Sequence, residues 1–221
     1  HAPEEELYPF GYIFGKTNYT DGVATQQPYY CRSDMSNGFY SATFYIPASL
    51  KDVVITGSSI TARAFYNCTG LTSVTISNSV TEIGAMAFNG CSNITSITIP
   101  ELVTNIGAAA FYNCRGLTTV TIPNSVTSIG EGAFSGCSSL TKITLPFTGK
   151  SRRSASDTYQ YPFGYIFGTN SYTGVTQTIQ EYYGKSTSST TSTQYYIPTS
   201  LKEVVITGCS YIPYGAFYKC D

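Results

Sequence analysis

The chain has 221 residues, and 12 Lys and Arg against 13 Asp and Glu leave a formal net charge of −1. That balance excludes the basic footprint of a nucleic-acid-binding protein and the polybasic patch of a membrane-surface protein. The longest apolar runs have four or five residues, far fewer than the roughly 20 that a membrane-spanning helix needs. We therefore expect no nucleic-acid partner and no membrane insertion within these residues.

Residues 1–45 are rich in Tyr and contain the aromatic segment Tyr8-Pro9-Phe10-Gly11-Tyr12-Ile13-Phe14-Gly15. The same eight residue types return at 161–168, so part of the chain is duplicated. We expect this segment to anchor an insertion onto the rest of the fold. Residues 1–45 then form most of one Tyr-rich insertion.

A repeat of 23 residues dominates residues 46–146, and such a period is typical of a solenoid. Each unit has a strand-like L-x-x-V-x-I segment and later an Ala-Phe pair with Cys three positions after the Phe. The recurring aromatic positions are Phe65, Phe88, Phe111 and Phe134, with a further copy at Phe217. The recurring thiols are Cys68, Cys91, Cys114 and Cys137, with a further copy at Cys220.

The pattern of one unit predicts its local structure. Val74 and Ile76 alternate with Ser73 and Thr75, as in a strand with one buried face. The Glu131-Gly132-Ala133-Phe134 stretch is too short for a stable helix, so we expect a single helical or 3-10 turn. One unit cannot bury its own apolar residues, but stacked units bury them in columns. At about 4.8 Å per strand, five units extend over roughly 20 Å.

Residues 147–195 form a second Tyr-rich insertion, and residues 196–221 return to the repeat and stop within it, as in an excerpt of a longer protein. The segment around Leu50 reappears 151 residues later around Leu201. We predict one domain over residues 1–221, with both insertions leaving the same edge of the stack. Five units apart, they would be separated by roughly 24 Å.

The units resemble the BspA-type leucine-rich repeats, a family of bacterial surface antigens and adhesins. Residues 117–137, from Leu117 through Pro123, Ile129-Gly130 and Ala133-Phe134 to Cys137, carry the family pattern throughout. The resemblance implies a mainly β, right-handed leucine-rich-repeat solenoid with short helical or 3-10 turns. It also implies export, display at the cell surface and binding of host or neighbouring-cell macromolecules, without catalytic residues or cofactors.

The four central thiols share one phase of the repeat, so we expect a buried column of free cysteines that pack as small apolar groups. Parallel side chains on adjacent strands keep Cβ atoms near 4.8 Å, which is too far for a usual disulfide. The pairing state of Cys31 and Cys209, which lie outside the column, stays open. Without a C-x-x-C pair or an internal His, the sequence predicts no metal site.

The sequence predicts no catalytic site. The only His is His1, at a chain end, and the Ser and Cys residues lack a partner base. The carboxylates Glu82, Glu101 and Glu131 occupy different phases of the repeat, so they do not converge. We therefore expect a binding or structural protein and not an enzyme.

The Tyr-rich insertions are the strongest functional candidate. Fifteen of the 20 Tyr lie in residues 1–45 and 147–196, among Ser, Thr, Gly and Asn. This composition is typical of binding loops, because Tyr offers a large amphipathic surface at low entropic cost. The predicted contact residues for a protein or glycan ligand are Tyr19, Tyr29, Tyr30, Tyr40, Tyr172, Tyr182, Tyr183 and Tyr195.

Two alternatives remain beside adhesion by a monomeric, extracellular module. The repeats can serve as a spacer that holds a distant functional domain, with the insertions bracing the stack. The outward Ser and Thr of the strands, from Ser73 and Thr75 to Thr119 and Thr121, also resemble the flat array of an ice-binding solenoid. Lys142 interrupts this array, and Thr suits any exposed parallel sheet by its β-branched shape.

Overall fold

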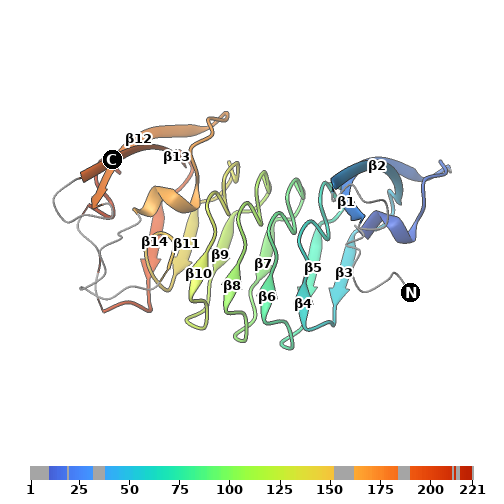
Figure 1. Cartoon of the computed structure of the whole chain (residues 1–221), viewed down its shortest axis with the longest axis horizontal. Helices are drawn as coiled ribbons and strands as arrows, with labels where there is room; N and C mark the ends of the chain where they lie inside the picture. The colour runs from blue at the N-terminus through green and yellow to red at the C-terminus, as the bar shows by residue number, and fades with distance from the viewer. Residues whose placement is uncertain are drawn as a thin grey trace.

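A computed structural model describes residues 10–18, 20–31, 38–151, 162–183, 190–210, 212 and 215–220. These residues form an elongated stack of parallel strands with an antiparallel hairpin at each end (Figure 1). Both hairpins lie along the same edge of the stack, the upper edge in Figure 1, as predicted.

The L-x-x-V-x-I segments form one side of the stack. Its strands, in spatial order, are β3 (Asp52–Ile55), β5 (Ser73–Ile76), β7 (Ser96–Thr98), β9 (Thr119–Thr121), β11 (Lys142–Leu145) and β14 (Glu203–Ile206). The pairs are parallel, and β7 and β9 align residues 23 apart, such as Ile97 with Val120. Burial alternates along these strands, so the apolar residue of each pair faces inward.

A second parallel sheet closes each unit from the opposite side. It contains the two-residue strands β4 (Ser59–Ile60), β6 (Glu82–Ile83), β8 (Asn105–Ile106) and β10 (Ser128–Ile129). Four regular coils result: coil 1 (50–68), coil 2 (71–91), coil 3 (94–114) and coil 4 (117–137). Coil 5 starts at Leu140 with β11, and coil 6 covers residues 201–220. The predicted mainly β leucine-rich-repeat solenoid is confirmed.

The segment around each Ala-Phe pair forms no continuous helix, and the predicted helical or 3-10 turn is present as separate turns with i to i+3 hydrogen bonds. Each turn spans four residues, as from Met86 to Asn89, where the Asn89 N–H donates to the Met86 carbonyl at 3.1 Å. Between these turns one residue has a positive φ: Arg63, Met86, Ala109 and Gly132 stand at this position with φ of 53° to 61°. A left-handed residue interrupts a right-handed helix, so the chain turns a corner instead.

The predicted aromatic column runs through the interior of the stack. Phe65, Phe88, Phe111 and Phe134 lie in one file, with ring centroids 5.3, 5.5 and 5.3 Å apart and nearly parallel planes. Phe217 departs from this file: it is half-buried and tilts against Phe163 instead. Among the described residues, no further coil covers it.

The thiol column is buried and free of disulfides, as predicted for Cys68, Cys91, Cys114 and Cys137. From Cys91 onward, each thiol of the column donates to a Phe carbonyl of the preceding coil, as Cys114 Sγ does to the Phe88 carbonyl at 3.2 Å. Burial raises the pKa of Cys68 and Cys137 to about 12 and that of the two thiols between them well above its ordinary value. Cys220 is exposed, so its predicted place in the interior column is wrong.

Candidate functional site

Each end of the stack carries the same composite element, which we call a cassette. Cassette 1 (10–47) contains the 3-10 helix η1 (Phe10–Ile13) and the hairpin β1 (Gly22–Cys31) and β2 (Gly38–Pro47). Cassette 2 (162–198) contains η2 (Phe163–Ile166) and the hairpin β12 (Val175–Tyr183) and β13 (Thr190–Pro198). The two Tyr-rich insertions thus share one fold.

The 3-10 helix packs under the hairpin through a glycine. A Cβ on Gly11 would lie 2.6 Å from Phe44 Cβ, and a Cβ on Gly164 would lie 2.5 Å from Tyr195 Cβ. Real Cβ atoms do not approach so closely, so only glycine fits between the helix and the hairpin. This contact explains the glycine of the Phe-Gly-Tyr-Ile sequence that both insertions share.

A buried glutamine joins each cassette to the stack. Gln27 is fully buried, its Oε1 accepts the Gly11 N–H at 2.7 Å, and its Nε2 donates to the Tyr66 carbonyl at 2.6 Å. The same Nε2 lies 3.3 Å from Cys68 Sγ. The amide therefore satisfies polar groups of the helix and of coil 1 together, and it fixes the hairpin on the turn.

Cassette 2 has the same arrangement. Gln180 is fully buried and accepts the Gly164 N–H at 2.6 Å. Its Nε2 lies 3.3 Å from the Tyr218 carbonyl and 3.0 Å from Cys220 Sγ. Sequence reasoning missed both glutamines. The available signal was their separation of 153 residues, the same as that between Phe10 and Phe163.

An aromatic contact joins each cassette to the phenylalanine of a coil. Phe10 lies 5.0 Å from Phe65, and Phe163 lies 5.0 Å from Phe217, at similar tilts. In both places the backbone N–H of the cassette phenylalanine donates to the Ala before the coil phenylalanine, at 2.8 Å. The Phe10 and Phe163 segments therefore anchor the cassettes to coil turns, as predicted.

Cassette 2 also completes coil 5. In regular coils the Phe N–H donates to the Ala carbonyl of the next coil, as Phe111 does to Ala133 at 2.8 Å. Phe134 donates instead to Ile166 at 2.9 Å, so Ile166-Phe167 occupies the place of an Ala-Phe pair. Both residues are fully buried. The second insertion is thus built into the stack and does not merely loop out of it.

Most of the predicted Tyr contact residues lie in the strands of the two hairpins. The strand register pairs Tyr29 with Tyr40, and it pairs Tyr182 with Thr191. These positions lie in the outer halves of the hairpins, away from the buried glutamines. The side chains of Tyr29, Tyr30, Tyr40, Tyr182 and Tyr183, and the whole of Tyr19, lie outside what the structure describes.

Tyr195 is not a surface residue, and its assignment to the contact surface is wrong. It is 3% exposed and occupies the place that Phe44 has in cassette 1, against the glycine of the 3-10 helix. Tyr172 is partly buried, and its hydroxyl donates to the Tyr196 carbonyl at 3.4 Å. Burial raises the Tyr172 pKa, and a hydrogen bond to the Gly136 backbone opposes that shift.

The outward face of the cassette 1 hairpin is polar where it is described. Gln26 Nε2 donates to Thr43 Oγ1, and Ser41 Oγ donates to Gln26 Oε1 at 3.0 Å. Across the described residues there is no group of three or more His, Cys, Asp or Glu side chains that could hold a metal ion. No helix in that same part of the chain is long and apolar enough to cross a membrane.

The outward Ser and Thr of the strands cover a small area. They are exposed on β5, β7 and β9, whereas the flanking strands present Val54 on one side and Lys142 on the other. Lys142 pairs with Glu203 at 2.8 Å. The Ser and Thr array is therefore three strands wide. Exposed Val54 bounds it on one side, and the Lys142–Glu203 ion pair bounds it on the other.

The sequence profile described as the BspA type leucine-rich repeat region matches residues 39–156 in six copies. The chain belongs to this family. No curated protein matches the chain. The matched span holds the regular coils and extends into the start of the second insertion, so most of both cassettes lies outside it.

Parts of the chain are similar to solved structures of bacterial leucine-rich-repeat proteins. A protein from Bacteroides ovatus is 38% identical, with 45% of this chain and 26% of that chain covered and a TM-score of 0.44. A leucine-rich cell surface protein from Faecalibacterium prausnitzii is 26% identical, with 71% and 44% covered and a TM-score of 0.39. The T. pallidum leucine-rich repeat protein is 24% identical, with 61% and 74% covered and a TM-score of 0.40. The chain spans about a quarter of the first of these.

Proposed function

We propose that the chain is a cell-surface or secreted binding module that engages a protein or glycan through its two Tyr-rich hairpins. The observation that carries this proposal is the duplicated cassette. Two copies of one hairpin lie along the same edge of the stack (Figure 1). A buried glutamine fixes each of them to a coil. A brace needs no such repetition of Tyr-rich strands at both ends.

Two sites at a fixed separation support avidity. Once one hairpin binds, the second meets its own site at a high effective concentration, provided that the ligand repeats at a matching distance. Since the hairpins are attached to coils and not to flexible linkers, little entropy is lost on the second contact. A repetitive polymer, such as a glycan or a matrix protein, fits this requirement.

The experiment compares hairpin variants on an array of host glycans and extracellular-matrix proteins. The first variant replaces Tyr29, Tyr30 and Tyr40 with Ser, the second replaces Tyr182 and Tyr183 with Ser, and the third combines both sets. The glutamine anchors stay intact, and Tyr66→Ser on a coil turn serves as the matched control. We expect each single-hairpin variant to lose tenfold or more in apparent affinity and the combined variant to lose binding.

A spacer role predicts a different result. If the combined variant binds the same array members as strongly as the unmodified chain, the hairpins are not the contact surface and the adhesion proposal fails. A loss confined to one hairpin would support monovalent binding and contradict the bivalent form. Ice-binding activity, measured as thermal hysteresis, would point to the Ser and Thr array on β5, β7 and β9.

A further inference from the structure

A groove lies over the Ala-Phe turns of the coils, on the edge of the stack that carries the hairpins (Figure 1). It has a volume of about 430 Å³ and extends from Tyr66 of coil 1 to Ser135 of coil 4. The exposed Thr169 and Asn170 of cassette 2 line it as well. None of these residues is among the hairpin tyrosines, so the groove is a separate surface.

One residue of each coil, the one after the Phe of the interior file, forms a column along this groove. In coils 1 to 4 these residues are Tyr66, Asn89, Tyr112 and Ser135. Backbone hydrogen bonds of 2.7 Å join neighbouring coils at this column, as between the Gly90 N–H and the Tyr112 carbonyl. Aromatic and polar side chains therefore alternate along the groove at the spacing of the coils.

The two tyrosines of the column are separated by two coils. The neighbouring Phe rings step by 5.3 and 5.5 Å from coil to coil, so the distance between Tyr66 and Tyr112 is roughly 10 Å. Both tyrosines are half-buried, so each keeps part of its side chain open to solvent. The C–H face of a pyranose ring packs on an aromatic ring, and two β-1,4-linked pyranose units cover a similar distance. The spacing thus fits alternate units of a β-1,4-linked saccharide.

The Ser135 hydroxyl lies at one end of this column without a hydrogen-bond partner. Ser135 is 1% exposed, and its Oγ has no partner among the described residues. Buried polar groups are normally paired, so an unpaired one calls for a specific explanation. Because Ser135 lines the groove, a ligand hydroxyl can supply the missing partner after rotation about the Cα–Cβ bond of the serine.

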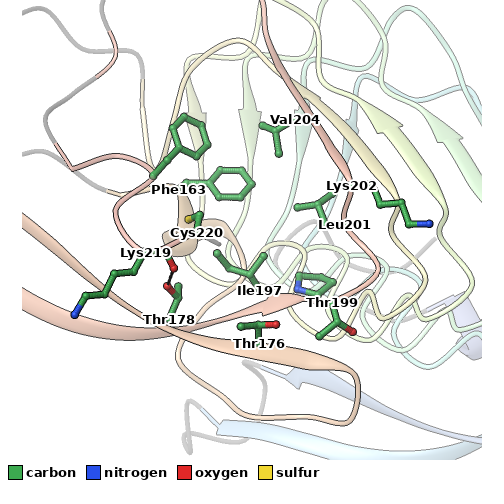
Figure 2. A pocket seen from close by; sticks show the side chains of 12 residues that line it. Phe163, Thr176, Thr178, Ile197, Thr199, Leu201, Lys202, Val204, Lys219 and Cys220 are labelled. Atoms are coloured by element: carbon green, nitrogen blue, oxygen red, sulfur yellow. Dashed lines mark hydrogen bonds between the residues drawn. The ribbon is translucent and has the colours of Figure 1, made fainter.

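The cavity between cassette 2 and coil 6 differs from the groove in this respect. It measures about 570 Å³, and Ile197 and Leu201 contribute apolar side chains to its lining (Figure 2). The buried Thr178 hydroxyl at this cavity already donates to the Lys219 carbonyl. Thr178 is therefore engaged by the protein, whereas Ser135 is available to a ligand.

The charge of the groove selects among saccharides. Glu131 is exposed there, and no Lys or Arg is found among the described residues that line the groove. An acidic saccharide would meet a like charge without a compensating cation, so a neutral one is favoured. Asn89, between the two tyrosines, offers both a donor and an acceptor to sugar hydroxyls.

We infer that the groove is a binding site for a neutral β-1,4-linked oligosaccharide. Alternate sugar rings pack on Tyr66 and Tyr112, and their hydroxyls form hydrogen bonds with Asn89 and Ser135. The hairpin tyrosines take no part in this contact. The site therefore does not depend on the ligand that we propose for the hairpins.

Isothermal titration calorimetry of the whole chain tests the inference, with cellotetraose and chitotetraose as two neutral β-1,4-linked probes. We expect saturable binding of at least one probe. Tyr112→Leu, which removes the flat ring, should weaken it about tenfold or more, and Tyr112→Phe, which keeps the ring, less than about threefold.

Ser135→Ala separates ligand binding from stability. The substitution should weaken binding about threefold or more without lowering Tm, because the hydroxyl has no partner in the protein to lose. Ser139→Ala, at an exposed position outside the groove lining, is the matched control and should leave binding unchanged.

The hairpin variants distinguish this site from the proposed adhesion surface. The combined hairpin variant should bind the probe as the unmodified chain does, and Tyr66→Ser should weaken this binding while it keeps binding through the hairpins. Failure of both probes to bind, equal binding by Tyr112→Leu, or loss of binding in the combined hairpin variant would overturn the inference. Equal binding of an oligogalacturonate of the same length, or preference for a proline-rich peptide, would overturn it too.

Discussion

Gly84, Gly107 and Gly130 follow the Ile of each short strand and allow adjacent coils to touch backbone to backbone. A Cβ on Gly107 would lie 2.4 Å from the Ala85 nitrogen, and the equivalent contacts of Gly84 and Gly130 are as short. Backbone atoms cannot move aside as a flexible side chain can. The Ile-Gly pair of the repeat is therefore a spacing requirement of the stack as well as a turn signal.

Gly107→Ala should lower the free energy of unfolding by about 2–3 kcal/mol, because the added methyl group forces coils 2 and 3 apart. Gly70→Ala is the matched control, since its nearest contact is the Leu50 oxygen at an ordinary 3.5 Å. The control should change stability by less than about 0.5 kcal/mol. Urea denaturation monitored by circular dichroism measures both, and equal effects of the two substitutions would contradict this account.

The buried thiols make stability depend on alkaline pH. An unfolded Cys ionises near pH 8.5, whereas burial holds the folded Cys137 pKa at about 12. The folded state thus prefers the neutral thiol, and this contribution is complete below about pH 8.5 and is lost as the pH rises toward 12. Between pH 7.5 and 9.5 each such thiol should cost about 1.4 kcal/mol of stability.

Cys137→Ala tests this pH dependence. The variant should be less stable than the unmodified chain at pH 7.5, because it leaves a small cavity, but its stability should fall less steeply up to pH 9.5. Ala133→Gly lowers stability without removing a thiol, so it should keep the original steepness. Urea titrations at several pH values compare the slopes, and identical slopes for all three proteins would show that the thiols play no part.

At the scale of elements, the sequence was sufficient to predict the core residues of the coils. It was insufficient to predict how the cassettes attach to them. The 23-residue period places Phe65 to Phe134 and Cys68 to Cys137 correctly, because every coil repeats the same contacts. The period says nothing about Gln27, whose partners are 16 and 39 residues away. Tyr195 was misplaced because Tyr-rich composition suggests exposure, although its alignment with Phe44 indicates a core position.

Gln27→Leu tests the role of the buried amide. The substitution leaves the Gly11 N–H and the Tyr66 carbonyl without their partner, and each unsatisfied buried group costs about 1–3 kcal/mol. We expect the β1–β2 hairpin to exchange its amide hydrogens tenfold or more faster. The unchanged cassette 2 is an internal reference, and Gln26→Leu on the exposed face is the control. Uniform protection in both hairpins of the Gln27 variant would refute this role.

At the scale of the whole molecule, the stack sets the distance between the hairpins. Each cassette is fixed to a coil turn by a glutamine and an aromatic contact, and the coils between them are joined by continuous backbone hydrogen bonds. Thr side chains reinforce the stacking, since Thr104 and Thr127 each donate to the carbonyl of the residue 23 positions earlier. The number of coils between the two hairpins thus sets the distance between them.

Deleting residues 94–116 removes one coil and keeps the Cys-x-x-Leu junction. The distance between the hairpins should fall by about 4.8 Å, one strand spacing. Spin labels at Ser41 and Ser192, equivalent exposed positions of the two hairpins, measure the change. The labelled background replaces Cys31, Cys209 and Cys220 with Ser. An unchanged distance in the shortened chain would contradict rigid attachment.

Because the turn that carries the aromatic file also carries the hairpin, a cassette can occupy only the positions that whole coils provide. Insertion or loss of repeat units during evolution therefore moves the two hairpins along the stack in discrete steps. A ligand whose own repeat distance falls between two steps cannot be matched by coil number alone. Intermediate distances must come from the outer halves of the hairpins, beyond the buried glutamines.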